Sequence, residues 1–239
     1  MPVITFANTK GGAGKTTVAL ILAGELLRRG YRVTMLDADP QQWISRWHRL
    51  AGTSAGVDVI GNVDADTIEG QVKGLNSKQT YIIIDLPGGL TPLLAKALGL
   101  SDQVLVPVQG SAMDAVGGAQ VLDILKELDR QCGIRIPHAV VLTRINSIIT
   151  TRSLTAVKDL LAEQHVAILD TALNERAAYR DMFISGGTLY SMDPMRVSNL
   201  DKAQENARAF GDEIAQMIPI KTVRPRASKR QSAAVKQAA

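Results

Sequence analysis

Two lysines and a threonine lie close together near the start of the chain, in the glycine-rich stretch NTKGGAGKTT. Gly14, Lys15 and Thr16 complete the pattern G-x-x-x-x-G-K-[ST]. In that pattern backbone N–H groups surround a phosphate, the lysine reaches the β- and γ-phosphates, and the hydroxyl ligates Mg²⁺. The first glycine of the pattern is replaced by Thr9. Lys10 is a second cation that phosphate binding within the loop does not require. The residues expected to contact phosphate are Gly11, Gly12, Ala13, Gly14, Lys15, Thr16 and Thr17.

Carboxylates follow two apolar segments that are expected to be strands. Asp37 and Asp39 come after Arg32–Leu36, and Asp85 comes after Tyr81–Ile84. In a parallel sheet the chemistry gathers at the carboxyl ends of the strands. We therefore expect Asp85 to hold Mg²⁺, directly or through a water, with Asp37 supporting the metal.

Asp39 has two compatible interpretations. A carboxylate beside the phosphates can orient the attacking water and accept its proton. Asp39 can also cap a helix that begins at Pro40, because proline is favoured in the first helical turn. Further along, Gly88 is placed so that backbone N–H groups can meet the γ-phosphate.

Trp43 and Trp47 are four residues apart, after the segment that follows Asp39. The simpler interpretation is that both belong to one apolar face of a helix in the core. The alternative is a dimer or partner surface that responds to the nucleotide, since the preceding loop lies at the γ-phosphate.

The elements that must position these residues alternate along the chain. Apolar strands that alternate with helices predict a doubly wound, mostly parallel sheet flanked by helices. The segment Ala51–Lys78 is glycine-rich and weakly patterned, and predicts no clear element. The expected strands are Val3–Ala7, Tyr31–Leu36, Tyr81–Ile84, Gln103–Val108, His138–Leu142 and Val166–Leu169. The expected helices are Thr16–Arg29, Thr91–Leu100, Met113–Cys132, Thr151–Gln164, Asn174–Ser185 and Leu200–Met217.

Composition and charge divide the 239 residues into a body and a tail. The net charge is +4, yet Ile220–Ala239 contains six basic residues and no acidic one, which leaves the remainder at −2. We expect residues 1–219 to form one domain and residues 220–239 a basic, disordered tail. Such a tail either adds affinity for nucleic acid or only improves solubility. The single cysteine, Cys132, excludes a disulfide framework, and no apolar run is long enough to span a membrane.

Several motifs resemble those of the ParA/MinD family of ATPases with a deviant phosphate loop. The segment Lys10–Thr17 is similar to that loop, Leu36–Gln41 to the next motif, and Ile82–Gly89 to the third. Val106–Asp114 is similar to the segment after the fourth motif strand. The resemblance extends from Met1 to about Ile218.

The resemblance implies a phosphate-loop ATPase that binds ATP and Mg²⁺. Lys10 would be the family's signature lysine, which reaches across an ATP-dependent homodimer to the nucleotide of the other subunit and acts as an arginine finger does. Lys10, Lys15 and Asp39 would be the catalytic residues, with Thr16, Asp37 and Asp85 at the metal. Arg144 would lie near the adenine, where it either stacks on the base or pairs on the surface.

Within this family the chain resembles the small ParA-like proteins that move plasmids or other cargo, with some similarity to VirC1. This implies a cytoplasmic, nucleoid-associated ATPase that binds DNA non-specifically and is stimulated by a ParB-like protein or cargo adaptor, without membrane binding. The candidate DNA contacts, besides the tail, are Arg152, Lys158, Arg176, Arg180, Arg196, Lys202 and Arg208.

Two other classes of function are open at this point. One is a metabolic ATP-dependent enzyme of the same fold, similar to dethiobiotin synthetase, that acts on a small molecule. The other is a nucleotide-gated adaptor that does not hydrolyse ATP. Of these three classes, only a partition ATPase is expected to hydrolyse ATP at a rate that responds to DNA.

Overall fold

The computed structural model describes residues 1–52, 56–75, 80–110, 112–146 and 151–218. The predicted basic tail, 220–239, lies outside these residues. Within them the chain builds a seven-stranded sheet in the order β3-β2-β4-β1-β5-β6-β7, and every pairing is parallel. The predicted fold class is confirmed. The strands are β1 (Val3–Phe6), β2 (Arg32–Asp37), β3 (Asp58–Ile60), β4 (Thr80–Asp85), β5 (Gln103–Gln109), β6 (His138–Ile145) and β7 (Leu173–Asn174).

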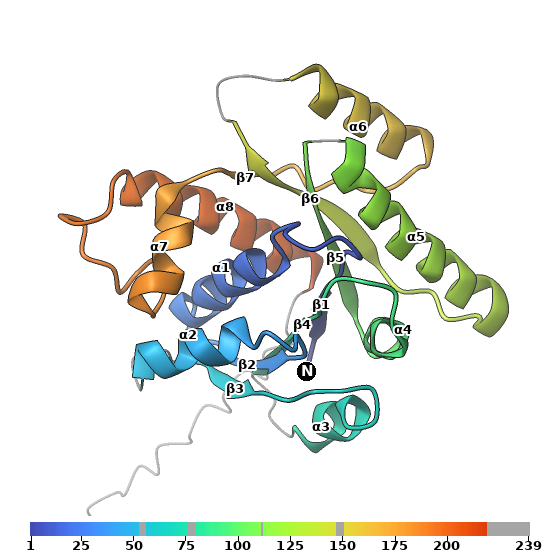
Figure 1. The fold of residues 1–239 in the computed structure, drawn as a ribbon, viewed down its shortest axis with the longest axis horizontal. Helices are drawn as coiled ribbons and strands as arrows, with labels where there is room; N and C mark the ends of the chain where they lie inside the picture. The colour runs from blue at the N-terminus through green and yellow to red at the C-terminus, as the bar shows by residue number, and fades with distance from the viewer. Residues whose placement is uncertain (53–55, 76–79, 111, 147–150, 219–239) are drawn as a thin grey trace, which may run out of the picture.

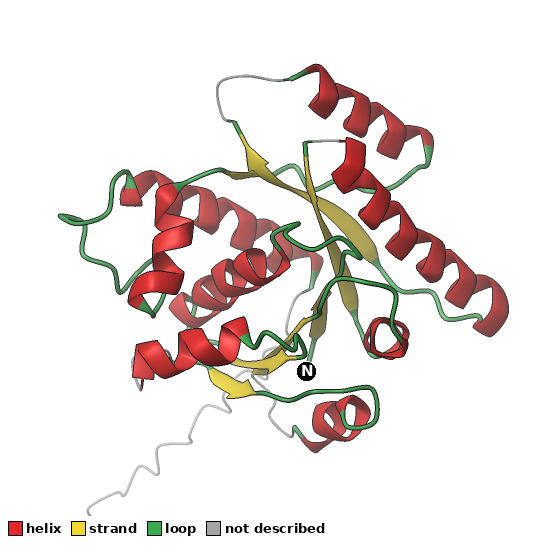
Figure 2. Ribbon diagram, viewed as in Figure 1, coloured by secondary structure: helices red, strands yellow, loops and turns green. Residues whose placement is uncertain are grey.

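Helices cover both faces of this sheet (Figures 1 and 2). One layer contains α1, α2, α7 and α8, and the other contains α3, α4, α5 and α6. The helices are α1 (Lys15–Arg28), α2 (Trp43–Ala51), α3 (Ile68–Gly74), α4 (Pro92–Gly99), α5 (Ala112–Cys132), α6 (Arg152–Glu163), α7 (Ala177–Ser185) and α8 (Leu200–Met217). No helix among the described residues is both long enough and apolar enough to cross a lipid bilayer.

The strands are apolar on both faces because both faces are covered. In β1, Ile4 and Phe6 pack on the side of α1, whereas Val3 packs in the opposite cluster. Successive side chains of a strand point to opposite faces, so a central strand under two helix layers needs no polar alternation. This explains the continuous apolar runs that predicted the strands.

The structure differs from the sequence-based expectation in two places. The weakly patterned segment Ala51–Lys78 contains β3 and α3, which the sequence did not predict. The expected strand Val166–Leu169 is wrong: only Ile168 forms a bridge, with Val140 of β6. The last strand is β7 instead. The helix expected from Asn174 therefore begins three residues later, as α7.

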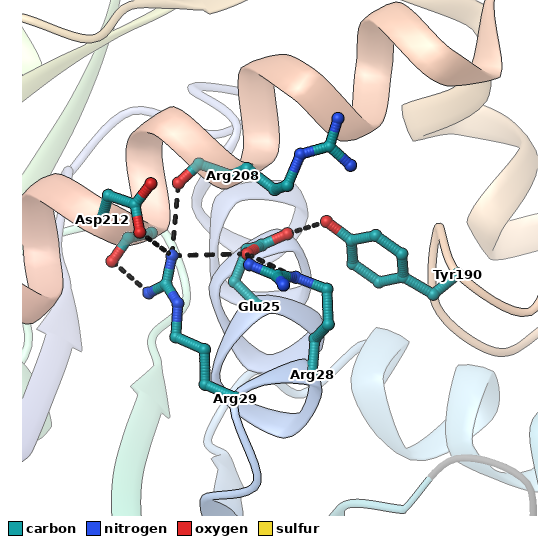
Figure 3. Close-up of polar contacts among 7 residues, drawn as sticks. Glu25, Arg28, Arg29, Tyr190, Arg208 and Asp212 are labelled. Carbon is teal, nitrogen blue, oxygen red and sulfur yellow. Dashed lines mark hydrogen bonds and ion pairs between the residues drawn. The ribbon is translucent and has the colours of Figure 1, made fainter.

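A buried carboxylate joins the far end of α1 to the C-terminal part of the chain (Figure 3). Glu25 is fully buried and accepts hydrogen bonds from Arg28, Arg29 and the Tyr190 hydroxyl. Arg29 also pairs with Asp212 of α8 at 2.8 Å. Buried charges of this kind require partners. Here the partners of Glu25 come from the end of α1 and from the segment between α7 and α8, and Arg29 extends the cluster to α8.

Candidate functional site

The candidate site lies at the carboxyl ends of β1, β2 and β4. The register of the sheet places Phe6 beside Asp85 and Asp85 beside Asp37. The loop from β1 to α1 therefore starts next to two acidic strand ends. The parallel sheet brings together the residues that the sequence had suggested, although long stretches of chain separate them.

The phosphate loop is folded for binding an anion. Gly14 precedes α1 with φ 98°, a conformation that favours glycine, and α1 begins at Lys15. The loop borders a hollow of about 550 Å³, in which a phosphate would meet the N-terminus of α1. The hollow is lined by Gly11, Gly12, Gly14, Lys15, Thr16, Thr17, Asp39, Gln41, Trp43, Gly88, Arg144, Arg180 and Phe183.

Lys15 is buried at the base of this hollow. Its Nζ donates to the carbonyl oxygens of Asn8 at 3.1 Å and Lys10 at 3.2 Å. Burial lowers the pKa of Lys15, and the carboxylates of Asp85 and Asp39 partly offset that effect. The ammonium is thus held by neutral carbonyls, which leaves it able to pair with a phosphate.

Thr16 and Asp85 are joined directly. The Thr16 hydroxyl donates to Asp85 Oδ2 at 2.7 Å. Asp85 is fully buried, and this desolvation raises its pKa to about 7, with Asp37 and Asp39 adding to the rise and Thr16 opposing it. A carboxylate that is buried beside other acids needs a cation to be stable as an anion.

The donor atoms around Asp85 fit a bound Mg²⁺. Asp85 Oδ1 and Asp37 Oδ1 are buried and have no hydrogen-bond partner. Hydroxyl and carboxylate oxygens are the ligands that Mg²⁺ prefers. Among the described residues no group of three or more His, Cys, Asp or Glu side chains is arranged to hold a metal alone. Thr16 and Asp85 would therefore share the ion with the phosphates, as is usual for Mg²⁺.

Asp37 also fixes the start of α2. Its Oδ2 accepts hydrogen bonds from the N–H of Ser45 at 2.8 Å and from the Ser45 hydroxyl at 2.7 Å. One oxygen of Asp37 is thus used for structure, while the other stays available in the site. Its role at the metal remains a prediction.

Asp39 is half-buried in the hollow beside Lys15 and Thr16. The expectation that it caps a helix starting at Pro40 is wrong. Its Oδ1 accepts from the Gln41 N–H at 2.8 Å in a local turn, and α2 begins only at Trp43. Gln42, with φ 52°, precedes the helix instead. The side chain of Asp39 is therefore positioned by a turn at the mouth of the site, where its water-orienting role remains a prediction.

The two tryptophans have different environments. Trp47 is 2% exposed and donates from Nε1 to the Gly187 carbonyl at 2.8 Å, so the core interpretation is confirmed for this residue. Trp43 is 43% exposed, lines the nucleotide hollow and stacks with the Arg46 guanidinium at 5.3 Å. Only Trp43 is placed to respond to a ligand.

A second hollow of about 200 Å³ adjoins the first one. Arg144 lines both, with φ 52°, which is a strained conformation for arginine. Arg176 and Arg180, expected to be DNA candidates, line this cleft, and Arg180 pairs with Glu175 at 3.1 Å. The hollow lies next to the phosphate loop, and the position of Arg144 near the adenine remains a prediction. Its walls include Gly14, Thr17, Val18, Ile21, Thr143, Leu173, Asn174 and Tyr179.

The structure adds residues that the sequence did not single out. Asn8 is 2% exposed and bonds the backbone of Lys10 at 2.8 Å. Gly117 and Gln120 of α5 contact the segment that leads to Lys10. The available signal was the glycine pair Gly117-Gly118 inside an expected helix, since an internal helix glycine usually has a packing reason.

The comparison with known proteins agrees with this geometry. A family model described as VirC1 protein matches residues 1–218. The chain belongs to the VirC1 family. Protein ParA of Rhizobium radiobacter is 36% identical over 210 residues, which covers 88% of this chain and 94% of that protein. Protein virC1 of Rhizobium rhizogenes is 28% identical, over 76% of this chain and 80% of its own length. The resemblance to the ParA/MinD family of phosphate-loop ATPases is confirmed.

Other relatives and solved structures belong to the same group. The maintenance of carboxysome distribution protein A of Halothiobacillus neapolitanus is 27% identical, over 90% of this chain and 94% of that protein. A complex of a Cyanothece McdA variant with ATP superposes with a TM-score of 0.70 at 18% identity, covering 90% of this chain and 96% of that one. The Aquifex aeolicus MinC:MinD complex gives 0.71 at 18% identity, covering 93% and 99%. At such identities these structures show the shared fold.

Proposed function

We propose that this VirC1-family chain is an ATPase that closes into a homodimer when it binds ATP and Mg²⁺. In this proposal the dimer binds DNA non-specifically, and a ParB-like or cargo-adaptor protein stimulates slow hydrolysis to release it. The role is the positioning or partition of a plasmid or other cargo. One observation carries the proposal: Lys15, Thr16 and Asp39 line one hollow, Asp85 accepts a hydrogen bond from the Thr16 hydroxyl there, and the Lys10 carbonyl accepts one from Lys15.

Each residue has a defined task in this proposal. Lys15 neutralises the β- and γ-phosphates, and the N–H groups from Gly11 to Thr16 surround them. Thr16 and Asp85 would hold the Mg²⁺, which would supply positive charge against the phosphates. Asp39 orients the attacking water and accepts its proton.

Lys10 completes the site of the partner subunit in this proposal. It lies in the phosphate loop directly before Gly11, which lines the hollow, and it is half-buried. A cation supplied in trans to the transferred phosphoryl group is worth about 10³–10⁵ in rate. Hydrolysis therefore becomes conditional on pairing, and ATP serves as the signal for the paired state.

Non-specific DNA binding is proposed for the exposed basic residues of α6 and the C-terminal region. Arg152 and Lys158 are exposed on α6. Arg196 pairs with Asp193 at 3.5 Å and Lys202 with Glu205 at 3.3 Å, both at the surface. Exposed pairs of this kind are weak, so they can be exchanged for phosphate contacts at little cost.

The decisive experiment compares Lys10→Ala with Lys73→Ala. Lys73 is a surface lysine of α3, so its replacement removes the same charge at a position away from the site. We expect Lys10→Ala to bind ATP nearly as the unmodified chain does, and to lose dimer-dependent hydrolysis by about 10³-fold or more. Turnover would be measured over a range of protein concentrations, with affinity from a fluorescent ATP analogue. Normal turnover by Lys10→Ala would rule out the role in trans.

A second measurement separates the proposed engine from the other two classes. ATP turnover is followed with and without duplex DNA at two salt concentrations. The proposal predicts that duplex DNA stimulates ATP turnover and that this stimulation weakens steeply as the salt concentration rises, because DNA binding releases counterions. Turnover that ignores DNA would favour a metabolic enzyme, and the absence of turnover would favour an adaptor.

A further inference from the structure

The segment that leads to Lys10 packs on the first half of α5. The Thr9 N–H lies 3.4 Å from the Gly117 carbonyl oxygen. The Thr9 hydroxyl lies 3.3 Å from the same oxygen and 2.5 Å from Gln120 Oε1. A hydroxyl donates one hydrogen bond at a time, so the shorter contact to Gln120 dominates. The residue before Lys10 is therefore held by α5.

A buried amide fixes the backbone of Lys10 from within. Asn8 Oδ1 accepts from the Lys10 N–H at 2.8 Å, and Asn8 Nδ2 donates to the Pro107 carbonyl of β5 at 2.7 Å. Asn8 is 2% exposed, and a buried amide resists displacement because an unpaired polar group in the interior is costly. The position of Lys10 is thus tied to β5 as well as to α5.

Gly117 leaves the space in which this arrangement fits. A Cβ atom at Gly117 would lie 2.2 Å from Asn8 Oδ1, and 2.9 Å from both the N and Cβ atoms of Lys10. Side chains do not tolerate such contacts, so any larger residue at this position must displace Asn8 or Lys10. Glycine weakens a helix interior, and its presence in the middle of α5 is explained by this close approach.

The opposite side of the segment contacts the loop that follows Asp85. The Gly89 N–H donates to the Thr9 carbonyl at 2.6 Å. The backbone before Lys10 therefore lies between α5 and the loop that follows the expected metal ligand, Asp85. A shift of α5 would move the segment relative to both nucleotides of a dimer.

We propose that Gly117 and Gln120 are positioning residues that set the approach of Lys10 to the nucleotide of the partner subunit. This inference rests on the proposed role of Lys10 in trans. It also explains why Thr9 stands where the motif has glycine, since its hydroxyl supplies the hydrogen bond to Gln120. The surface of α5 thereby becomes a place from which hydrolysis can be controlled without contact to ATP.

The test compares Gly117→Ala with Gly70→Ala, a helical glycine of α3 at which an added Cβ would have no neighbour within 4 Å. For Gly117→Ala we expect kcat to fall by about 10²-fold, since a misplacement of about 1 Å can cost that much. ATP affinity should fall much less than kcat, because Lys15 and Thr16 still make the monomer contacts and only the carbonyl partners of Lys15, on Asn8 and Lys10, are disturbed. Gly70→Ala should hydrolyse ATP normally.

A double variant identifies the residue through which Gly117 acts. Combined with Lys10→Ala, Gly117→Ala should cause no further loss, because both changes remove the same contribution. Normal kcat for Gly117→Ala, or an additive loss in the double variant, would overturn the inference while Lys10→Ala still tested the proposed function. If Lys10→Ala alone had normal turnover, the proposed function itself would fail.

The second contact provides a test that does not disturb the helix backbone. Thr9→Val keeps the shape of the side chain and removes the donor to Gln120, whereas Thr9→Ser keeps the donor. We expect Thr9→Val to lower kcat several-fold with an unchanged affinity for the ATP analogue, and Thr9→Ser to restore it. Equal kcat values for the two variants would contradict a positioning role for Gln120.

Discussion

The Thr16 hydroxyl donates a 2.7 Å hydrogen bond to Asp85, across 69 residues of sequence. This contact joins the first turn of α1 to the end of β4 at the point where metal and phosphate are expected. Replacing Thr16 with valine leaves a buried carboxylate oxygen without its donor, which should lower the free energy of unfolding by about 1–3 kcal/mol. Mg²⁺-dependent ATP binding should weaken as well. Urea denaturation and nucleotide titration would check both effects, and Thr16→Ser should restore them.

The raised pKa of Asp85 makes a prediction about pH for the nucleotide-free protein. Burial raises this pKa to about 7, whereas the unfolded chain has the ordinary value of 3.8. Between these values the unfolded state loses the proton first, so stability from this group is complete below pH 4 and is lost as the pH rises towards 7. Asp85→Asn removes the effect. Its advantage over the unmodified chain should grow from pH 4 to 7, to a value on the order of 4 kcal/mol, and then stay constant.

Thermal unfolding at a series of pH values measures this difference. Parallel curves for the two proteins would show that Asp85 is not desolvated as described. The same variant should bind ATP without the usual dependence on Mg²⁺, because the expected metal ligand is gone.

Asp39 is expected to act in hydrolysis and not in binding. Asp39→Ala should lower turnover by about 10²–10⁴-fold, the range of a lost general base. Asp39→Asn keeps an acceptor for the Gln41 N–H, so the local turn should survive while the proton acceptor is lost. Equal loss in both variants, with unchanged affinity for an ATP analogue, would support chemistry. A loss confined to Asp39→Ala would instead indicate a purely structural role in the turn.

The two tryptophans provide an internal optical test. Trp43 is exposed beside the phosphate loop, whereas Trp47 is buried and bonded to Gly187. We expect ATP to change the emission of the chain and Trp43→Phe to abolish that change with little effect on stability. Trp47→Phe should keep the response and unfold more easily, by about 1–3 kcal/mol, through the lost hydrogen bond and volume. A response that persists in Trp43→Phe would place the sensor elsewhere.

The contacts of Glu25 make a prediction about stability. Tyr190→Phe leaves one oxygen of a fully buried carboxylate without its donor. The expected loss is about 1–3 kcal/mol in the free energy of unfolding. Glu25 lies at the opposite end of α1 from Lys15, so affinity for ATP should change little. Tyr31→Phe offers a control, since that half-buried ring packs against Tyr81. Equal losses in the two variants would argue against the importance of the carboxylate.

The sequence predicted the elements whose structure depends mainly on neighbouring residues. The apolar strands and the phosphate loop were recognisable because burial on both faces and glycine spacing leave direct traces in the sequence. The strand β3 has only three residues, two of them half-buried, and so leaves little trace. Val166 and Leu169 are buried and apolar, but only one residue between them pairs with β6, which no periodicity reveals.

The site shows the same division. Lys15, Thr16 and Asp85 were found from motifs. The contacts of Asn8 with Pro107, and of Thr9 with Gln120, join residues about a hundred positions apart. The local sequence around each residue gives no sign of its partner. Asp39 illustrates the opposite error, because an aspartate before a proline predicts a helix cap, while the structure uses it in a turn.

The ion-pair cluster around Glu25 also constrains how the chain matures during synthesis. Glu25 is synthesised well before Tyr190, which follows it by 165 residues, and before Asp212, which contacts Arg29. Until they arrive, the helix that carries the phosphate loop has an acidic group on the face that must be buried. Full burial of this face of α1 therefore depends on segments of the chain that are synthesised long after the helix itself.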